Sequence, residues 1–102
     1  MNYSNLYGCQ DRYLLQVKGE LEQCLGILLE ERESDYHGGL YYSHKFESGG
    51  RLMLKQNIDL YDDEPAEQKF PDFPALLYVS FSGGVDPVAQ LLPSNLRLLR
   101  KA

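Results

Sequence analysis

The apolar and polar side chains of residues 13–18 alternate along the chain, which is typical of a strand. Gly19 ends the alternation, so we expect the strand to stop there. Residues 1–10 show little pattern, and we expect them to fray or to lie across a sheet edge. The apolar face of the predicted strand carries Tyr13, Leu15 and Val17.

From Glu20 the apolar residues recur at intervals of three and four, which predicts a short helix. The stripe that this helix should bury consists of Leu21, Cys24, Leu25 and Leu28. Gly26 weakens the end of the pattern. Residues 27–33 therefore fit either the end of the helix or a strand, and the sequence leaves both readings open.

A β-hairpin is predicted in the middle of the chain. After a turn at residues 34–39, alternation returns over residues 40–47, and Ser48-Gly49-Gly50 supplies the residues that a tight hairpin turn requires. The return strand is predicted to run to Leu60. The inner faces of the two strands should carry Leu40, Tyr42, His44 and Phe46, and Leu52, Leu54, Ile58 and Leu60.

The last third of the chain begins with a loop over residues 61–74 that three prolines should stiffen. Residues 75–81 are apolar on both faces, which predicts a central strand. Asp86-Pro87 is a suitable start for a second short helix. Its buried side would carry Val88, Leu91 and Leu92, and residues 96–100 would form a final strand.

Hairpins combined with two helices predict an α+β fold. We expect one domain, residues 1–102, with a mostly antiparallel sheet of five to six strands and both helices packed on one face. The shared core should contain Leu15, Val17, Leu21, Leu25, Leu52, Leu54, Leu77, Val79, Val88 and Leu91.

The charges of the chain are unevenly distributed. The net charge is −5, and ten of the fifteen acidic residues lie in two windows, Glu30–Asp35 with a charge of −3 and Asp59–Asp72 with −5. The remainder of the chain is therefore positive by 3. Such windows repel nucleic acid and attract cationic partners, so they favour a protein-binding function over a nucleic-acid-binding one.

The sequence contains no recognisable metal or cofactor motif. A calcium-binding loop that begins at Asp59 would place Glu64 where glycine is required and Phe70 where a bidentate glutamate is required. The candidate zinc ligands also lack the usual spacing. They are Cys9, Cys24, His37 and His44. We therefore expect neither a metal nor a cofactor.

Catalytic residues are not predicted either. Cys24 should be buried in the helix stripe and Cys9 should lie in an unstructured lead, so neither fits an activated thiolate. The glycine pairs are not part of a phosphate-binding motif. The chain has no run of about 18 apolar residues and no signal-peptide pattern, which predicts a cytoplasmic protein with reduced thiols and no membrane partner.

Three segments carry a resemblance to a known group of proteins: ERESDYHGGLYY at residues 31–42, LKQNIDLYDDEPAE at 54–67 and FPDFPALLYV at 70–79. Together they resemble small, acidic bacterial immunity proteins of toxin systems, including contact-dependent growth inhibition. The resemblance implies a cytosolic, non-enzymatic protein that binds and neutralises a toxin domain, often a nuclease.

The charge windows and the resemblance both predict an acidic surface for a basic protein partner. Alternatives are a structural or regulatory interaction module, a homodimer formed through an exposed strand edge, and a small enzyme with tyrosines and His37 in its pocket. The predicted partner-binding residues are Glu30, Glu31, Glu33, Asp35, Tyr36, Asp59, Tyr61, Asp62, Asp63, Glu64, Glu67 and Asp72.

Overall fold

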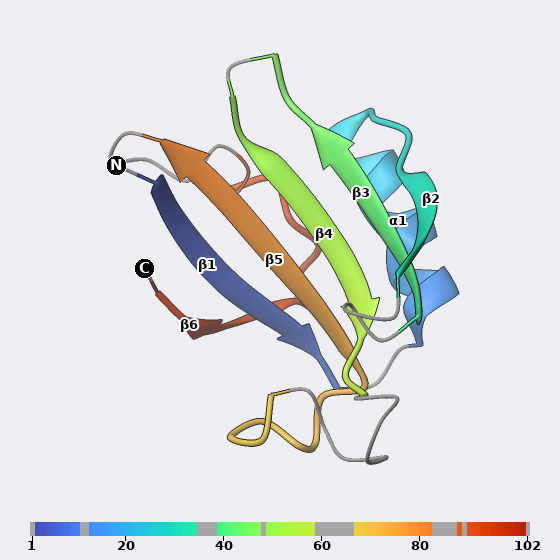
Figure 1. The fold of residues 1–102 in the computed structure, drawn as a ribbon, viewed down its shortest axis with the longest axis vertical. Coiled ribbons are helices and arrows are strands. Elements are labelled where there is room, and N and C mark those ends of the chain that lie inside the picture. Colours follow the sequence, from blue (N-terminus) through green and yellow to red (C-terminus); the bar gives the residue numbers. More distant parts are fainter. Residues whose placement is uncertain are drawn as a thin grey trace.

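The fold is α+β, with one antiparallel sheet and one helix among the described residues (Figure 1). The computed structural model describes residues 2–10, 13–34, 39–47, 49–58, 67–82, 88 and 90–101. The strand order is β2-β3-β4-β5-β1-β6. The elements are β1 (Asn2–Cys9), α1 (Leu14–Leu25), β2 (Glu30–Ser34), β3 (Gly39–Lys45), β4 (Arg51–Gln56), β5 (Ala75–Ser82) and β6 (Arg97–Arg100).

Helix α1 and the segment formed by residues 88 and 90–96 lie on the same face of the sheet, behind the strands in Figure 1. The main core forms between them and the strands. A hydrogen bond of 2.8 Å from Asn95 Nδ2 to Glu20 Oε2 ties the segment to the helix. Seven of the ten predicted core residues are buried there: Val17, Leu21, Leu52, Leu54, Leu77, Val79 and Val88. Leu25 is partly buried against them, whereas Leu15 and Leu91 are exposed, so the core was predicted correctly only in part.

The prediction for residues 1–10 was wrong. Residues 2–9 form β1, an interior strand that pairs with β5 along its whole length and with β6 on its other side. Leu6 and Cys9 are fully buried, and they face opposite sides of the sheet. The segment shows weak periodicity because both of its faces are covered, so burial does not alternate along it.

The strand predicted at residues 13–18 was also wrong, because these residues begin α1. The apparent alternation masks a helical stripe, since Leu14, Val17 and Leu21 are buried on one side of the helix while Leu15 is 69% exposed. Gly19 continues the helix. Cys24 is exposed rather than buried. The buried stripe of the helix runs through Leu14, Val17 and Leu21, and Cys24 lies beside this stripe instead of within it.

The end of α1 is held by Glu22. Its carboxylate accepts a hydrogen bond from the Leu29 backbone N–H at 2.8 Å and one from Lys18 Nζ at 3.2 Å. The Leu29 contact lowers the pKa of Glu22; burial opposes this shift, and the bond and charge of Lys18 reinforce it. Gly26 takes the left-handed conformation that commonly ends a helix, with φ 65°. The chain then enters β2, which settles residues 30–33 as strand.

The predicted hairpin is confirmed. β3 and β4 pair in antiparallel register, and the turn is closed by a 2.7 Å hydrogen bond from the Phe46 N–H to the Gly50 carbonyl oxygen. Gly49 has φ 101°, a conformation that favours glycine. β4 is shorter than predicted and ends at Gln56, so Ile58 lies outside the strand, and Leu60 lies outside the described residues.

The end of the chain differs from the prediction in one respect. β5 is a central strand between β4 and β1, and β6 forms at residues 97–100, both as predicted. The second helix predicted from Asp86 is not formed by the described residues of this segment: Val88 and Leu91 lie in turns and Leu92 in a bend, while Asp86 and Pro87 lie outside the described residues. Leu91 is 56% exposed, so it does not join the predicted core.

The face of the sheet opposite α1 is covered only in part. Phe70 and Phe73 from the loop, with Leu99 from β6, pack on Leu6 and Leu76. The rest of this face, over β3, β4 and the adjacent part of β5, has no layer of described residues above it. We call it the open sheet face, and its side chains are Tyr41, Ser43, Lys45, Arg51, Met53 and Ser80 with Glu30 and Arg32 of β2. Lys55, at the end of β4 near the covered part, points to the same side and is buried.

Among the described residues, no helix is long and apolar enough to cross a membrane.

Candidate functional site

The first acidic window forms the edge strand β2. Glu30, Glu31 and Glu33 are all exposed on it, and they point to both faces because side chains alternate along a strand. Glu30 forms an ion pair of 3.2 Å with Arg32. Glu31 accepts a 3.4 Å hydrogen bond from the hydroxyl of Tyr42, a buried core residue. Glu33 therefore has the freest carboxylate of the three.

The Tyr42 hydroxyl is a structural feature of this edge. Burial raises the pKa of Tyr42, and the charge of Glu31 adds to the effect. Lys18 of α1 lies over the Tyr42 ring, 5.4 Å from its centroid, and opposes the shift. The hydroxyl consequently stays protonated and acts as a donor to Glu31. This contact ties the acidic edge to the core.

The second acidic window is described only at its end. Seven predicted binding residues lie outside the described residues: Asp35, Tyr36, Asp59, Tyr61, Asp62, Asp63 and Glu64. Asp72 is exposed in a turn between Phe70 and Phe73, whose rings pack edge to face at 6.4 Å. These two rings anchor the loop on the sheet through Leu6 and Leu76.

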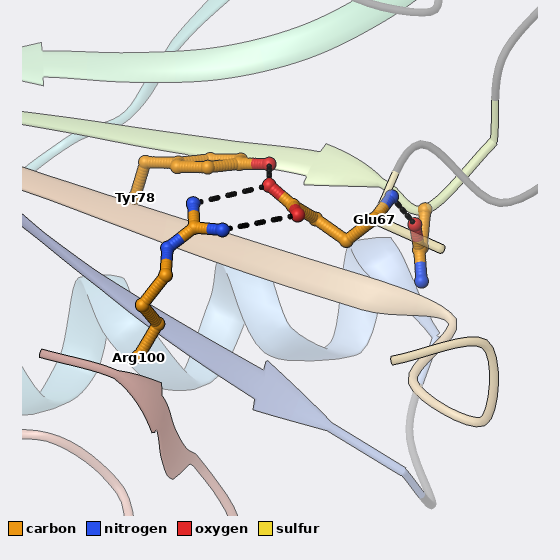
Figure 2. Close-up of polar contacts among 4 residues, drawn as sticks. Glu67, Tyr78 and Arg100 are labelled. Carbon is orange, nitrogen blue, oxygen red and sulfur yellow. Dashed lines mark hydrogen bonds and ion pairs between the residues drawn. The ribbon is translucent and has the colours of Figure 1, made fainter. Parts of the chain in front are cut away.

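Glu67 is bound within the molecule (Figure 2). Its Oε1 accepts a hydrogen bond of 2.7 Å from the Tyr78 hydroxyl, and its two carboxylate oxygens accept bonds of 3.2 and 3.3 Å from the guanidinium of Arg100. Its backbone N–H donates to Asn57 Oδ1 at 2.9 Å. The side chain thus joins the loop to β5 and β6, and its part in partner binding stays a prediction.

Glu67, Tyr78 and Arg100 form one cluster, and the pKa shifts of Glu67 and Tyr78 follow from the contacts within it. Partial burial disfavours the charged form of Glu67, but the hydrogen bonds from Tyr78 and Arg100, with the charges of Arg100 and Lys55, outweigh it and lower the pKa. Burial raises the pKa of Tyr78, and the contact with the Glu67 carboxylate raises it further. Near neutral pH the cluster is therefore a carboxylate held by one hydroxyl donor and one guanidinium.

Replacing Glu67 with glutamine should lower the free energy of unfolding by about 1–2 kcal/mol near pH 7. A neutral amide cannot accept both Arg100 bonds as a carboxylate does, and Arg100 is half exposed, which limits the loss. Urea unfolding of Glu67→Gln measures the change. Glu47→Gln, at an exposed carboxylate in the hairpin turn, should change stability by less than about 0.5 kcal/mol.

The same variant has an expected pH dependence. Because the pKa of Glu67 is lowered in the folded state, its stabilisation is present above its ordinary pKa of 4.5 and is lost as the pH falls through the folded value. The difference between the parent chain and Glu67→Gln should shrink on acidification below that range. A difference that stays constant down to about pH 2 would show that the carboxylate's charge is not what stabilises the loop.

The described acids of the two windows do not form one cluster. Glu30 lies on β2 at one edge of the sheet, whereas Glu67 contacts β5, and two strands separate β2 from β5. Three strand spacings place them about 14 Å apart across the sheet. The described residues thus supply one acidic edge at β2, one neutralised carboxylate near β5 and the exposed Asp72 in the loop.

Sequence reasoning missed a basic group on the open sheet face. Lys45 of β3 pairs directly with Arg51 of β4, and Arg32 of β2 lies on the same face. The hairpin register that brings the two cations together can be counted from the Ser48-Gly49-Gly50 turn. The other signal was the charge of +3 that the chain carries outside its acidic windows, to which Lys45 and Arg51 contribute.

The described cysteines and His44 are the remaining candidates for metal binding or thiol chemistry. The described residues contain no group of three or more potential metal ligands among histidine, cysteine, aspartate and glutamate. Cys9 is buried in β1 and Cys24 is exposed on α1, and both are free thiols. His44 is partly buried on the helix side of β3, the inner face predicted for it, and packs edge to face with Phe46 at 4.8 Å.

Comparison with known proteins adds no assignment. No family model matches the chain, no significant match was found among curated proteins, and none was found among solved structures.

Proposed function

We propose that the chain is a non-enzymatic protein-binding domain that acts in the cytoplasm by binding and neutralising a toxin domain. The observation that supports this most is β2, an edge strand with three exposed carboxylates. Such a strand combines an acidic surface with a row of backbone groups that no other described strand pairs with. The class of partner follows from the resemblance of residues 31–42, 54–67 and 70–79 to immunity proteins.

The chemistry of β2 fits a basic partner. Its outer side pairs with no described strand, so backbone N–H and C=O groups are open to an added strand or a loop. Glu33 is exposed and has no described ion-pair partner, and Glu30 is two-thirds exposed in its pair with Arg32. A nuclease toxin has a basic cleft because it must hold phosphates, and opposite fields accelerate the association of two such proteins.

The same strand disfavours a homodimer formed through this edge. In an antiparallel pairing of two β2 strands centred on Arg32, each Glu31 would lie directly opposite a Glu33 of the other copy, and Arg32 would face its own counterpart. Like charges directly opposite one another destabilise a strand pair. The interaction-module alternative with an unlike, basic partner is compatible with the same evidence.

The proposal is tested with the product of the gene next to the one that encodes this chain. That protein is expressed alone and together with the chain, and growth of the host and complex formation are measured. The proposal expects the neighbouring product to inhibit growth, the chain to relieve the inhibition and the two to purify as a complex. A neighbouring product that is harmless and does not bind the chain would contradict it.

Replacing Glu30 and Glu33 together with glutamine should weaken that complex at least about tenfold at low salt. The reason is the loss of two carboxylates that face the partner's cations, and the effect should shrink at about 0.5 M salt because exposed charges are screened. Titration calorimetry at the two salt concentrations measures it. The matched control, Glu47→Gln, removes an exposed carboxylate from the hairpin turn and should leave affinity unchanged; equal effects of both variants would contradict a binding edge at β2.

A further inference from the structure

The open sheet face is hollowed across β2, β3 and β4. It is lined by Met53, by His44 and by the hydroxyl-bearing residues Tyr41 and Ser43. Three cationic side chains, those of Arg32, Lys45 and Arg51, and one carboxylate, that of Glu30, also line it. A second hollow next to it shares Lys45 and Arg51 and continues to Ser4 and Ser80. The two cations thus stand between two concave regions of the same face.

Lys45 and Arg51 are an unusual pair for a stable sheet. They are directly opposite in the register of β3 and β4, both are exposed, and neither forms an ion pair with a described residue. The side chains of opposite residues begin about 5 Å apart, and like charges at that separation repel. A ligand that carries negative charge would remove the repulsion, so the pair is arranged to gain from an anion.

The charge of the hollow sets the charge of its ligand. Three cations and the Glu30 carboxylate leave an excess of two positive charges, in a chain whose net charge is −5. A phosphate monoester carries about −1.5 to −2 near pH 7 and presents three acceptor oxygens. Arginine matches such oxygens with paired N–H donors, and the Ser43 hydroxyl can donate a further bond.

A long polyanion fits the same place less well. The hollow ends at β2, where Glu30 lies on the same face and Glu31 and Glu33 point to the opposite one, so a strand of nucleic acid running along the face would meet the Glu30 carboxylate at the acidic edge. A compact dianion satisfies the cations without reaching the other acids. The geometry and charge therefore favour one phosphate group over a chain of them.

We propose that this hollow binds a small phosphate monoester, with Lys45 and Arg51 as the principal ligands of the phosphate and Arg32 and Ser43 beside them. This site shares Glu30 and Arg32 with the β2 edge, but its principal ligands lie on β3 and β4, and it does not depend on the toxin-binding proposal. Its ligand chemistry is that of a phosphate group on a small molecule.

The test follows amide chemical shifts of the ¹⁵N-labelled chain during titration with inorganic phosphate, O-phosphoserine and a nucleoside monophosphate. The expected result is saturable shifts centred on Ser43, Lys45 and Arg51. Equal affinity for the three probes would mean that the phosphate group alone is recognised, and tighter binding of one ester would identify the organic part that the hollow contacts. Absence of saturable shifts at these residues would overturn the proposal.

Arg51→Gln supplies the decisive comparison, with Arg97→Gln of β6 as a control that removes an exposed cation elsewhere. Arg51→Gln should weaken phosphate binding about tenfold, and it should unfold at the same or a higher temperature than the parent chain because the repulsion is relieved. Arg97→Gln should bind as the parent does. Equal weakening in both variants would reduce the effect to general charge, and tighter binding of a single-stranded 12-mer oligonucleotide at the same residues would make this a nucleic-acid site instead; either result overturns the proposal.

Discussion

Replacing Leu21 with alanine should lower the free energy of unfolding by about 2–5 kcal/mol. Leu21 is fully buried between α1 and the sheet, in the same core as Leu52, Leu54 and Leu77. Its loss removes buried apolar surface and leaves a cavity that close-packed strands cannot fill. Chemical denaturation followed by circular dichroism measures the change.

The matched control is Leu15→Ala in the same helix. Leu15 is 69% exposed, so the substitution should change stability by less than about 0.5 kcal/mol. The pair also separates two interpretations of residues 13–18, since a strand with Leu15 on its inner face would make Leu15→Ala costly. A loss of about 2 kcal/mol or more at Leu15 would contradict the helix and its buried stripe.

Replacing Gly8 with alanine should be the second most harmful of these changes, at about 1–3 kcal/mol. A Cβ at Gly8 would lie 2.6 Å from Leu99 Cδ1 and 2.8 Å from Phe73 Cδ1, so the side chains that cover this part of β1 would have to move. The slightly better strand propensity of alanine offsets little of this cost. Thermal unfolding of Gly8→Ala measures the effect.

Gly19→Ala has the opposite expected sign and serves as its control. Gly19 lies within α1, and a Cβ there would meet nothing within 4 Å. The substitution should stabilise the chain by about 0.5–1 kcal/mol, because alanine loses less backbone entropy than glycine in a helix. If both substitutions destabilise the chain, the open surroundings of Gly19 or its place in the helix are wrong.

These two pairs of variants lie in β1 and α1, where periodicity in the sequence led to the wrong prediction. It led to the right one in the hairpin. The β3–β4 hairpin was predictable because one face of each strand is wet and the glycines of the turn are local signals. The first 20 residues were misjudged for two different reasons. β1 is covered on both faces, so its apolar and polar residues do not alternate. At the start of α1, the order of polar and apolar residues over six positions fits both the strand period and the helix period.

The candidate site was predictable only in part. Local composition identified β2 as acidic, and the structure places Glu30, Glu31 and Glu33 at an exposed sheet edge. The environment of Glu67 was not predictable, because its partners Tyr78 and Arg100 lie 11 and 33 residues away in the chain. A carboxylate that the sequence places in an acidic binding window is thereby partly buried and bound by two side chains of the same molecule.

By itself the sequence determined the α+β class, the central hairpin and the apolar strand β5, together with the acidity of the two windows. These depend on neighbouring residues, whose spacing decides which face of an element is apolar. The tertiary structure alone decided that β1 is interior, that α1 covers one face only, and that Lys45 and Arg51 share the open face with Arg32. Strand order and register bring together residues distant in the chain, so no local pattern contains them.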